Sequence, residues 1–303
     1  MTELTLDLEH TYVHTNNFLT NNIRTNTIRL HTIQTGPEDG PVVILLHGFP
    51  EFWFGWRKQI EPLAKAGFRL IIPDQRGYNL SDKPSGIESY RLEHLAADIL
   101  GIIELTGQKT VSLVGHDWGG IVAWWVAMHY PNRLRNLSIL NAPHPYIMQQ
   151  TLRQNPRQVL SSLYALFFQI PRLPEAWMRN NNWELLVNSL IKSSRPATFK
   201  AEDLEYYRRS WLQEGAMTAM LHWYRANFRY RPIFPQDLHI HIPTLLIWGA
   251  RDIALIESMA KDSIDLCKNG RLEVFENATH WVQHEEHDRI NEMLVGFLHV
   301  AGQ

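Results

Sequence analysis

The chain has 303 residues, and 45% of them are hydrophobic, which suffices for the core of one large α/β domain with an insertion. Its formal net charge is only −2, so the composition argues against a nucleic-acid or membrane-surface partner and favours small molecules. Cys267 is the only cysteine, which excludes an internal disulfide and a thiolate metal cluster.

The amino-terminal segment 1–17 is polar and lacks the basic and apolar stretches of a secretory signal. No stretch approaches the ~18 consecutive apolar residues that a membrane span requires. We therefore expect a cytoplasmic protein. The sequence leaves open whether it is a monomer or a homodimer.

Strands and helices alternate up to residue 140. The segments 18–24 and 28–35 alternate around Asn26-Thr27, which predicts an antiparallel hairpin at a sheet edge. The unbroken aliphatic run at 42–46 is typical of a strand buried on both faces of a sheet. The other elements predicted here are strands at 70–72, 111–114 and 137–140 and helices at 53–66, 90–105 and 121–128. This alternation indicates a mostly parallel sheet with helices on both faces.

The alternation stops between residues 141 and 235, where Trp, Tyr, Phe, Pro and Arg are abundant. Helices are predicted there at 158–168, 183–191 and 216–227. Alternation then resumes with strands at 244–249 and 272–275 and helices at 256–266 and 285–300. We therefore predict one core domain formed by residues 1–141 and 236–303, with a helical cap of residues 142–235 inserted after the sixth predicted strand.

The stretch GHDWGG at 115–120 links a predicted strand to a predicted helix. Glycines on both sides of its centre permit a turn too sharp for a Cβ atom, so residue 117 projects beside the first amides of the helix. This is the arrangement of a nucleophile elbow, with Asp in place of Ser. A serine needs a base to become nucleophilic, whereas a carboxylate with a pKa of about 4 is already ionised at neutral pH. Asp117 can therefore attack carbon directly.

Polar groups follow four of the predicted strands: the segment HGFP at 47–50, Asp117, Asp252 and His280. Ligands of parallel sheets bind beyond the carboxyl ends of the strands, so we expect these groups to converge. Asp117, Asp252 and His280 also occur in the chain order nucleophile, acid, histidine.

The assignment of Asp252 has an alternative. The residue could instead cap a helix, and the acid could be supplied from elsewhere, such as after the strand at 137–140. The residues that follow that strand are Asn141 and Ala142, which carry no carboxylate. We therefore predict that Asp252 is the acid.

Five motifs together resemble those of the α/β-hydrolases, and specifically of the epoxide hydrolases. They are HGFPEFWFGWR (47–57), DQRGYNLSDKP (74–84), GHDWGG (115–120), WGARD (248–252) and NATHW (277–281). The resemblance extends over residues 18–300 and implies an α/β-hydrolase fold with a helical cap. One departure is Asn79, where the family usually has Gly. Asn tolerates left-handed backbone, so we expect the loop to be retained.

The resemblance implies roles for two tyrosines of the predicted cap. In epoxide hydrolases two cap tyrosines face the nucleophile, and the matching segments here are YALFFQ (164–169) and HWYRAN (222–227). Tyr164 and Tyr224 would hydrogen-bond the epoxide oxygen and assist its protonation. Both lie beside other aromatic residues, so packing in the core is the alternative role for each.

The resemblance implies catalysis in two steps. Asp117 would attack an epoxide carbon to form an alkyl-enzyme ester, and His280, oriented by Asp252, would activate the water that hydrolyses the ester. The product is a vicinal diol, and no metal or organic cofactor is expected.

The resemblance also implies a binding site for a small hydrophobic epoxide. The backbone amides of Phe49 and Trp118 would form an oxyanion hole. The side chains of Phe49, Trp53, Trp56 and Trp118 are expected to line an apolar pocket.

Two alternatives to an epoxide hydrolase remain. Haloalkane dehalogenases share the Asp nucleophile, but many place Asn where this chain has Phe49, and fluoroacetate-type enzymes place Arg where it has Trp118. The alternative of another class is a non-catalytic homologue that binds a small apolar ligand.

Overall fold

The structure is a computed structural model that describes residues 8–300 apart from 16–18, 21–22 and 25–26. Its main sheet consists of β1 (Glu9–Thr15), β4 (Ile28–Thr35), β5 (Val42–Leu46), β6 (Arg69–Pro73), β7 (Val111–His116), β8 (Leu134–Leu140), β9 (Thr244–Gly249) and β10 (Gly270–Phe275). The strand order is β1-β4-β6-β5-β7-β8-β9-β10. The pairs β1/β4 and β4/β6 are antiparallel, and all other pairs of this sheet are parallel.

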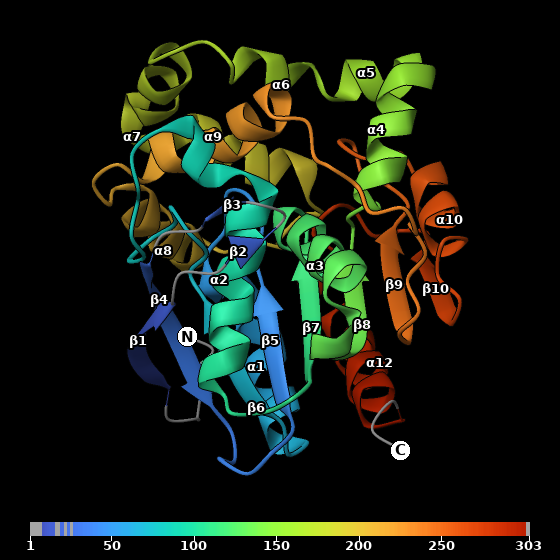
Figure 1. Ribbon diagram of the computed structural model, residues 1–303. Coiled ribbons are helices and arrows are strands. Elements are labelled where there is room, and N and C mark those ends of the chain that lie inside the picture. The colour runs from blue at the N-terminus through green and yellow to red at the C-terminus, as the bar shows by residue number, and fades with distance from the viewer. Residues whose placement is uncertain (1–7, 16–18, 21–22, 25–26, 301–303) are drawn as a thin grey trace.

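Helices cover both faces of the sheet (Figure 1). Helices α2 (Leu92–Leu105) and α3 (Trp118–His129) lie on one face, and α1 (Arg57–Lys65) and α12 (His287–Val300) lie on the other. The shorter elements are α10 (Ser258–Ile264), α11 (Val282–Glu285) and the 3₁₀ turns η1 (Trp53–Trp56), η2 (Ile87–Tyr90) and η3 (Pro131–Arg133). This is the α/β-hydrolase fold predicted from the sequence.

Six helices lie between β8 and β9 in the chain, and we call them the helical insertion. They are α4 (Pro145–Gln154), α5 (Pro156–Ser161), α6 (Leu163–Phe167), α7 (Leu173–Ser193), α8 (Ala201–Trp211) and α9 (Ala216–Arg229). Figure 1 shows them stacked across the carboxyl ends of the parallel strands. The predicted helix at 158–168 is in fact split into α5 and α6. The one predicted at 183–191 is the second half of α7, whose backbone leaves helical geometry at residues 180–183.

Burial explains why the central elements were recognisable in the sequence. Every residue of β5 is fully buried, as its unbroken aliphatic run predicts. Helix α3 is apolar on almost all sides because it is buried on almost all sides, and Trp124 and Trp125 are both completely buried. Among the residues that the structure describes, no helix is both long enough and apolar enough to cross a bilayer.

The edge of the sheet differs from the prediction. β4 pairs with β1, from Glu9 opposite Gln34 to Thr15 opposite Ile28, and not with the segment 18–24. Within that segment Leu19–Thr20 (β2) and Ile23–Arg24 (β3) form a separate two-stranded sheet, and the other predicted residues lie outside the described ones. β1 has the sequence EHTYVHT and is mostly exposed, so it carries little of the apolar alternation by which a strand is recognised. An edge strand is held largely by backbone hydrogen bonds, which side-chain patterns do not report.

Polar side chains attach the helical insertion to the loop after β5. The indole of Trp211 donates a hydrogen bond to the carbonyl oxygen of Pro50 (2.7 Å), and the hydroxyl of Tyr207 donates one to a carboxylate oxygen of Glu51 (2.5 Å). The indole of Trp223 donates to the carbonyl oxygen of Arg76 (2.9 Å). The insertion therefore rests directly on the loops at the carboxyl ends of β5 and β6.

Candidate active site

Asp117 stands in a sharp turn between β7 and α3. Its backbone has φ 51° and ψ −122°, a conformation that is rare for a residue with a Cβ atom. The turn requires two glycines for close approach: a Cβ at Gly119 would collide with the carbonyl oxygen of Leu46, and one at Gly48 would collide with the Asp117 carboxylate. The predicted elbow is present, and its backbone directs the carboxylate away from the sheet.

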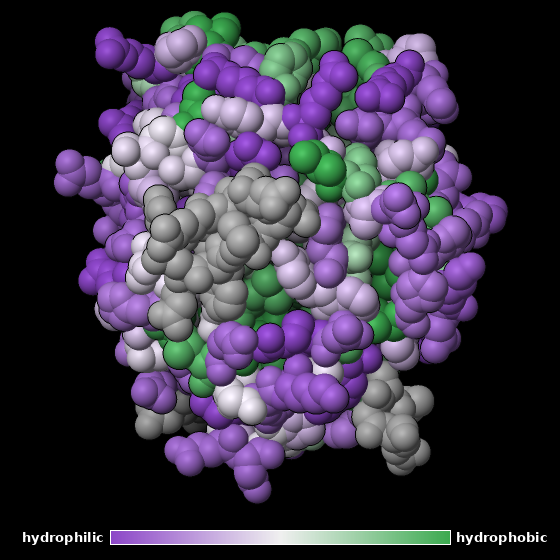
Figure 2. All heavy atoms as spheres, in the orientation of Figure 1, coloured by the Kyte–Doolittle hydropathy of each residue, from purple (hydrophilic) through white to green (hydrophobic). Residues whose placement is uncertain are grey.

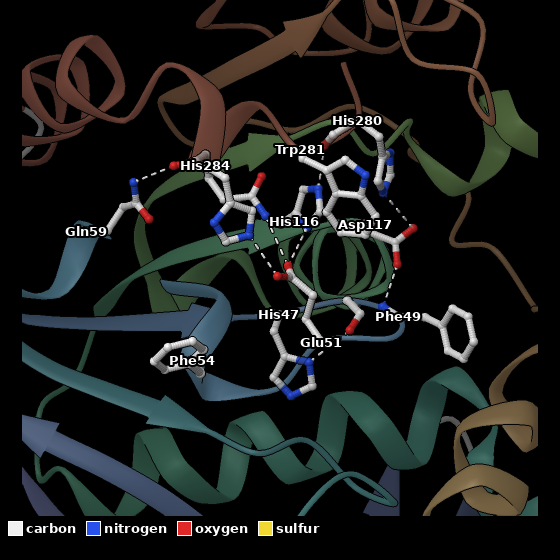
Figure 3. A network of polar contacts seen from close by, with 12 residues as sticks. His47, Phe49, Glu51, Phe54, Gln59, His116, Asp117, His280, Trp281 and His284 are labelled. Atoms are coloured by element: carbon white, nitrogen blue, oxygen red, sulfur yellow. Dashed lines mark hydrogen bonds and ion pairs between the residues drawn. The ribbon is translucent and has the colours of Figure 1, made fainter. Parts of the chain in front are cut away.

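The two carboxylate oxygens of Asp117 have different partners (Figure 3). The backbone amide of Phe49 donates a hydrogen bond to Oδ1 (2.8 Å). Oδ2 lies 3.6 Å from Nε2 of His280. One oxygen is thus held by the loop after β5, and the other faces the imidazole and the cavity.

His280 and Asp252 form a close pair behind Asp117. Nδ1 of His280 lies 2.7 Å from Oδ2 of Asp252. The backbone amides of Ala254 and Leu255 donate to Oδ1 of Asp252 at 2.8 and 3.0 Å. The carboxylate is therefore fixed by several donors, and it orients the imidazole so that Nε2 points at Asp117.

Neighbouring carboxylates control the charge of His280. Burial by itself lowers a histidine pKa, but the hydrogen bond and charge of Asp252, together with the charge of Asp117, raise the pKa of His280 to about 9. The same pairing holds the pKa of Asp252 below its usual value even though burial opposes it. While Asp117 is ionised, His280 is a cation at neutral pH.

Tyr164 of α6 and Tyr224 of α9 lie across the cavity from the sheet, with ring centroids 5.9 Å apart. The ring of Tyr224 packs edge-on against Phe49 (5.3 Å) and Trp118 (5.0 Å). Burial raises the pKa of both hydroxyls, and the charge of Asp117 raises it further. Both hydroxyls therefore remain protonated donors at neutral pH.

Two cavities meet at these residues. One, of about 260 Å³, lies against Trp118 and α4, and the other, of about 350 Å³, lies against Phe49 and α7. Asp117, Tyr164 and Tyr224 line both of them. A substrate that occupied either cavity would have its reacting atoms between the carboxylate and the two hydroxyls.

The structure places two of the predicted pocket residues elsewhere. Phe49 and Trp118 line the cavities, but Trp53 and Trp56 do not. The indole of Trp53 packs edge-on against His10 of β1 (5.9 Å), and Trp56 is 1% exposed in the core. Trp53 therefore lies outside both cavities, because η1 turns its side chain toward the edge of the sheet.

Asn141 supports Asp252, a role that its position in the sequence does not reveal. Its amide donates a hydrogen bond to Oδ2 of Asp252 (2.8 Å), and its side-chain oxygen accepts one from the amide of Gly249 (2.8 Å). Asn141 lies 111 residues from Asp252 in the chain, so no local pattern could report this contact.

A second missed group is a buried carboxylate behind the histidine (Figure 3). Glu51 is 1% exposed and lies 3.5 Å from Nδ1 of His116 and 2.8 Å from Nε2 of His284. Nε2 of His116 contacts the carbonyl oxygen of His280 (2.8 Å). The segment that carries His280 is thus connected through His116 to the loop that carries Phe49.

Asn79 adopts the left-handed backbone that its loop requires. Its φ is 40°, within the left-handed region, and its amide donates to Oδ2 of Asp74 (2.8 Å). Asn therefore adopts the backbone that the family usually assigns to Gly, as expected.

Comparison with known proteins identifies the family of the chain. Residues 41–287 match the family model described as alpha/beta hydrolase fold. The chain is 46% identical over 264 residues to AB hydrolase superfamily protein YfhM of Bacillus subtilis, covering 87% of this chain and 92% of that protein. It is 37% identical over 272 residues to Epoxide hydrolase 2 of Caenorhabditis elegans, covering 88% of this chain and 76% of that protein.

Solved structures agree with these relatives. An epoxide hydrolase of Bacillus megaterium, crystallised with an inhibitor, superposes with a TM-score of 0.83 at 31% identity, covering 95% of this chain and all of that one. Epoxide Hydrolase A of Mycobacterium thermoresistibile gives a TM-score of 0.81 at 26% identity, covering 97% and 98%. The chain belongs to the α/β-hydrolase family, in the branch that contains the epoxide hydrolases.

Proposed function

We propose that the protein is an epoxide hydrolase that converts a small hydrophobic epoxide and water to a vicinal diol. The observation that carries the proposal is the position of Asp117, which has a His–Asp pair on one side and two protonated tyrosine hydroxyls on the other. Relatives and structural neighbours named as epoxide hydrolases support it. The helical insertion would act as a cap that supplies the two hydroxyls.

Ring opening is the first proposed step. Oδ2 of Asp117 attacks an epoxide carbon, and the bond from that carbon to the ring oxygen breaks as the ester bond forms. Tyr164 and Tyr224 hydrogen-bond the ring oxygen, and one of them transfers its proton to the developing alkoxide. The phenols are protonated at neutral pH, and the proton can pass to the alkoxide because the alkoxide is the stronger base.

The negative charge of Asp117 disappears when its ester forms. The pKa of His280 must then fall, because part of its elevation comes from that charge. His280 gives up its proton, which restores the tyrosine, and the neutral imidazole is left as a base. Formation of the ester therefore converts His280 into the neutral base that the hydrolysis step needs.

Hydrolysis is the second proposed step. Neutral His280 takes a proton from water, and the oxygen attacks the carbonyl carbon of the ester at Asp117. The backbone amides of Phe49 and Trp118 stabilise the oxyanion, with one such donor worth on the order of 3 kcal/mol. Collapse releases the diol, and Asp117 is again a carboxylate beside a protonated His280.

A trapping experiment tests this proposal. The His280→Gln variant should stall at the ester, because no base is left to activate water. After exposure to styrene oxide, its intact mass should rise by the mass of the whole epoxide. The double variant Asp117→Asn/His280→Gln is the control and should show no increase.

The same experiment separates the alternatives. An alkyl adduct from 1-bromobutane, with none from styrene oxide, would replace the proposal by a haloalkane dehalogenase. An absence of adducts across a modest panel of epoxides would favour a non-catalytic ligand-binding protein.

The charge coupling of His280 gives a second prediction. In the free wild-type protein, the imidazole should titrate near the value of about 9 to which Asp252, Asp117 and Glu51 raise its pKa. In Asp117→Asn, one of these charges is removed, so the pKa of His280 should fall. NMR titration of the His280 ring measures both values. An equal or higher pKa in Asp117→Asn would contradict the proposed charge switch.

A further inference from the structure

The outer surface of the helical insertion exposes a run of large apolar side chains. We call it the apolar rim, and it consists of Leu160, Leu163, Leu166, Ile170, Leu173 and Trp177, each of which is at least 43% exposed. Leu160 is 67% exposed and Trp177 is 53% exposed. Scattered apolar residues on a surface need no explanation, but six of them within eighteen residues of one surface segment do.

The apolar rim occupies the end of the molecule farthest from the amino ends of the strands. Its residues belong to α5, α6, the turn after α6 and the start of α7, and Figure 1 shows these helices along the outer edge of the insertion. In Figure 2 green spheres along that edge are interleaved with purple, hydrophilic ones.

The charges around the apolar rim are mainly positive. Helices α4 to α7 and the turns that join them carry five exposed cations. In the described part of the chain none of the five forms an ion pair: Arg153, Arg157, Arg172, Arg179 and Lys192. The same helices hold only two acidic residues, and one of these, Glu175, is buried against Arg225 (2.6 Å). The other is Glu184.

The near-neutral total charge conceals this asymmetry. Residues 145–229 contain eleven Lys and Arg against six Asp and Glu, a balance of +5, so the rest of the chain carries −7. Our expectation that no membrane surface is a partner rested on the total of −2. The relevant quantity is the charge of the face that would make contact.

The apolar rim also adjoins the site. Trp177 and Tyr164 belong to the same helices as the rim and line the larger cavity with Asp117. The Tyr164 residue is 42% exposed although its hydroxyl is buried, so it is accessible at the surface and also lines the cavity. One wall of the cavity that contains the carboxylate therefore belongs to this face.

A bilayer with anionic lipids fits this face better than a second copy of the chain does. A two-fold dimer through the apolar rim would place the unpaired arginines of one copy close to those of the other. An anionic lipid surface instead attracts them, while large apolar side chains enter the boundary between headgroups and acyl chains.

We propose that the apolar rim and its flanking cations dock the protein on the surface of anionic lipid bilayers, with the helical insertion facing the lipid. Docking presents the cavity to apolar molecules that partition into the membrane. Binding to vesicles is measured without turnover, so its result is independent of the proposed epoxide hydrolase activity.

Cosedimentation with vesicles tests the proposal on the full chain. The probes are vesicles of phosphatidylcholine with roughly one third phosphatidylglycerol, and vesicles of pure phosphatidylcholine. The wild type should bind the anionic vesicles more than about 25-fold more tightly, because five cations contribute, and about 0.5 M NaCl should remove most of that difference by screening.

Two double variants and a matched control locate the contact. Arg157→Gln/Arg172→Gln should weaken binding about fivefold for each cation, or roughly 25-fold together. Leu160→Ser/Leu173→Ser should weaken it at least as much, because both leucines are more than half exposed on the rim. The control Leu105→Ser/Lys109→Gln, also at exposed positions but at the amino end of β7, should bind like the wild type.

Other outcomes overturn the proposal. If the wild type does not bind anionic vesicles, or if the control loses as much binding as the rim variants, the apolar rim is not a lipid-docking surface. If the wild type is a dimer in sedimentation velocity without lipid, does not bind vesicles, and becomes a monomer in Leu160→Ser/Leu173→Ser, the rim is a dimer interface instead.

Discussion

Asp117→Asn is expected to abolish epoxide turnover, lowering kcat by roughly 10⁴-fold or more. An amide oxygen is a far weaker nucleophile than a carboxylate oxygen. Among the described residues that line the two cavities, Asp117 is the only one with a carboxylate, so none of the others could replace it. The fold should be intact, because the substitution keeps the size of the side chain and leaves an oxygen for the Phe49 amide. Diol formation in single-turnover and steady-state assays measures the effect.

A matched variant controls for nonspecific damage in that experiment. Asp82→Asn removes an exposed carboxylate whose ion-pair partner, Arg29, is exposed as well. Its activity should stay within about twofold of the wild type, since such surface pairs contribute little. If Asp117→Asn retains wild-type turnover, another group is the nucleophile and the proposed mechanism is wrong.

The double variant Tyr164→Phe/Tyr224→Phe should lower the rate of epoxide ring opening by about 10³-fold or more. Both proposed donors to the ring oxygen are removed, while the rings keep their contacts with Phe168 and with each other. Each single variant should retain more activity than the double variant, because one donor remains. Ester formation, followed by rapid-quench mass spectrometry, isolates this step from hydrolysis.

Tyr206→Phe is the control for the tyrosine variants. This residue also belongs to the helical insertion, but its side chain is 49% exposed and stacks on Phe54 away from Asp117. It should turn over epoxide at the wild-type rate. If ring opening survives the loss of both Tyr164 and Tyr224, the proton donor lies elsewhere.

Patterns within single segments predicted the centre of the fold. Buried parallel strands such as β5 have an unbroken aliphatic signature because both of their faces are covered. Residues that follow such strands must meet at one edge of the sheet, and for this reason Asp117, Asp252 and His280 could be grouped before their distances were known.

Features that depend on contacts distant in sequence could not be predicted in this way. β1 is held at the sheet edge by backbone hydrogen bonds to β4, and its side chains show no apolar period. The orientation of Trp53 depends on packing against His10 in that same strand. Asn141 donates a hydrogen bond to Asp252 from another loop, and no sequence pattern links residues so far apart in the chain.

The anchoring of the helical insertion restricts how the site can open. Trp211 and Tyr207 hold Pro50 and Glu51, which directly follow Phe49, the residue whose amide binds Asp117. Lifting the whole insertion as a rigid lid would pull this loop and withdraw the amide from the nucleophile. Smaller movements within the insertion would instead allow substrate and product to exchange while the Phe49 amide stays bound to Asp117.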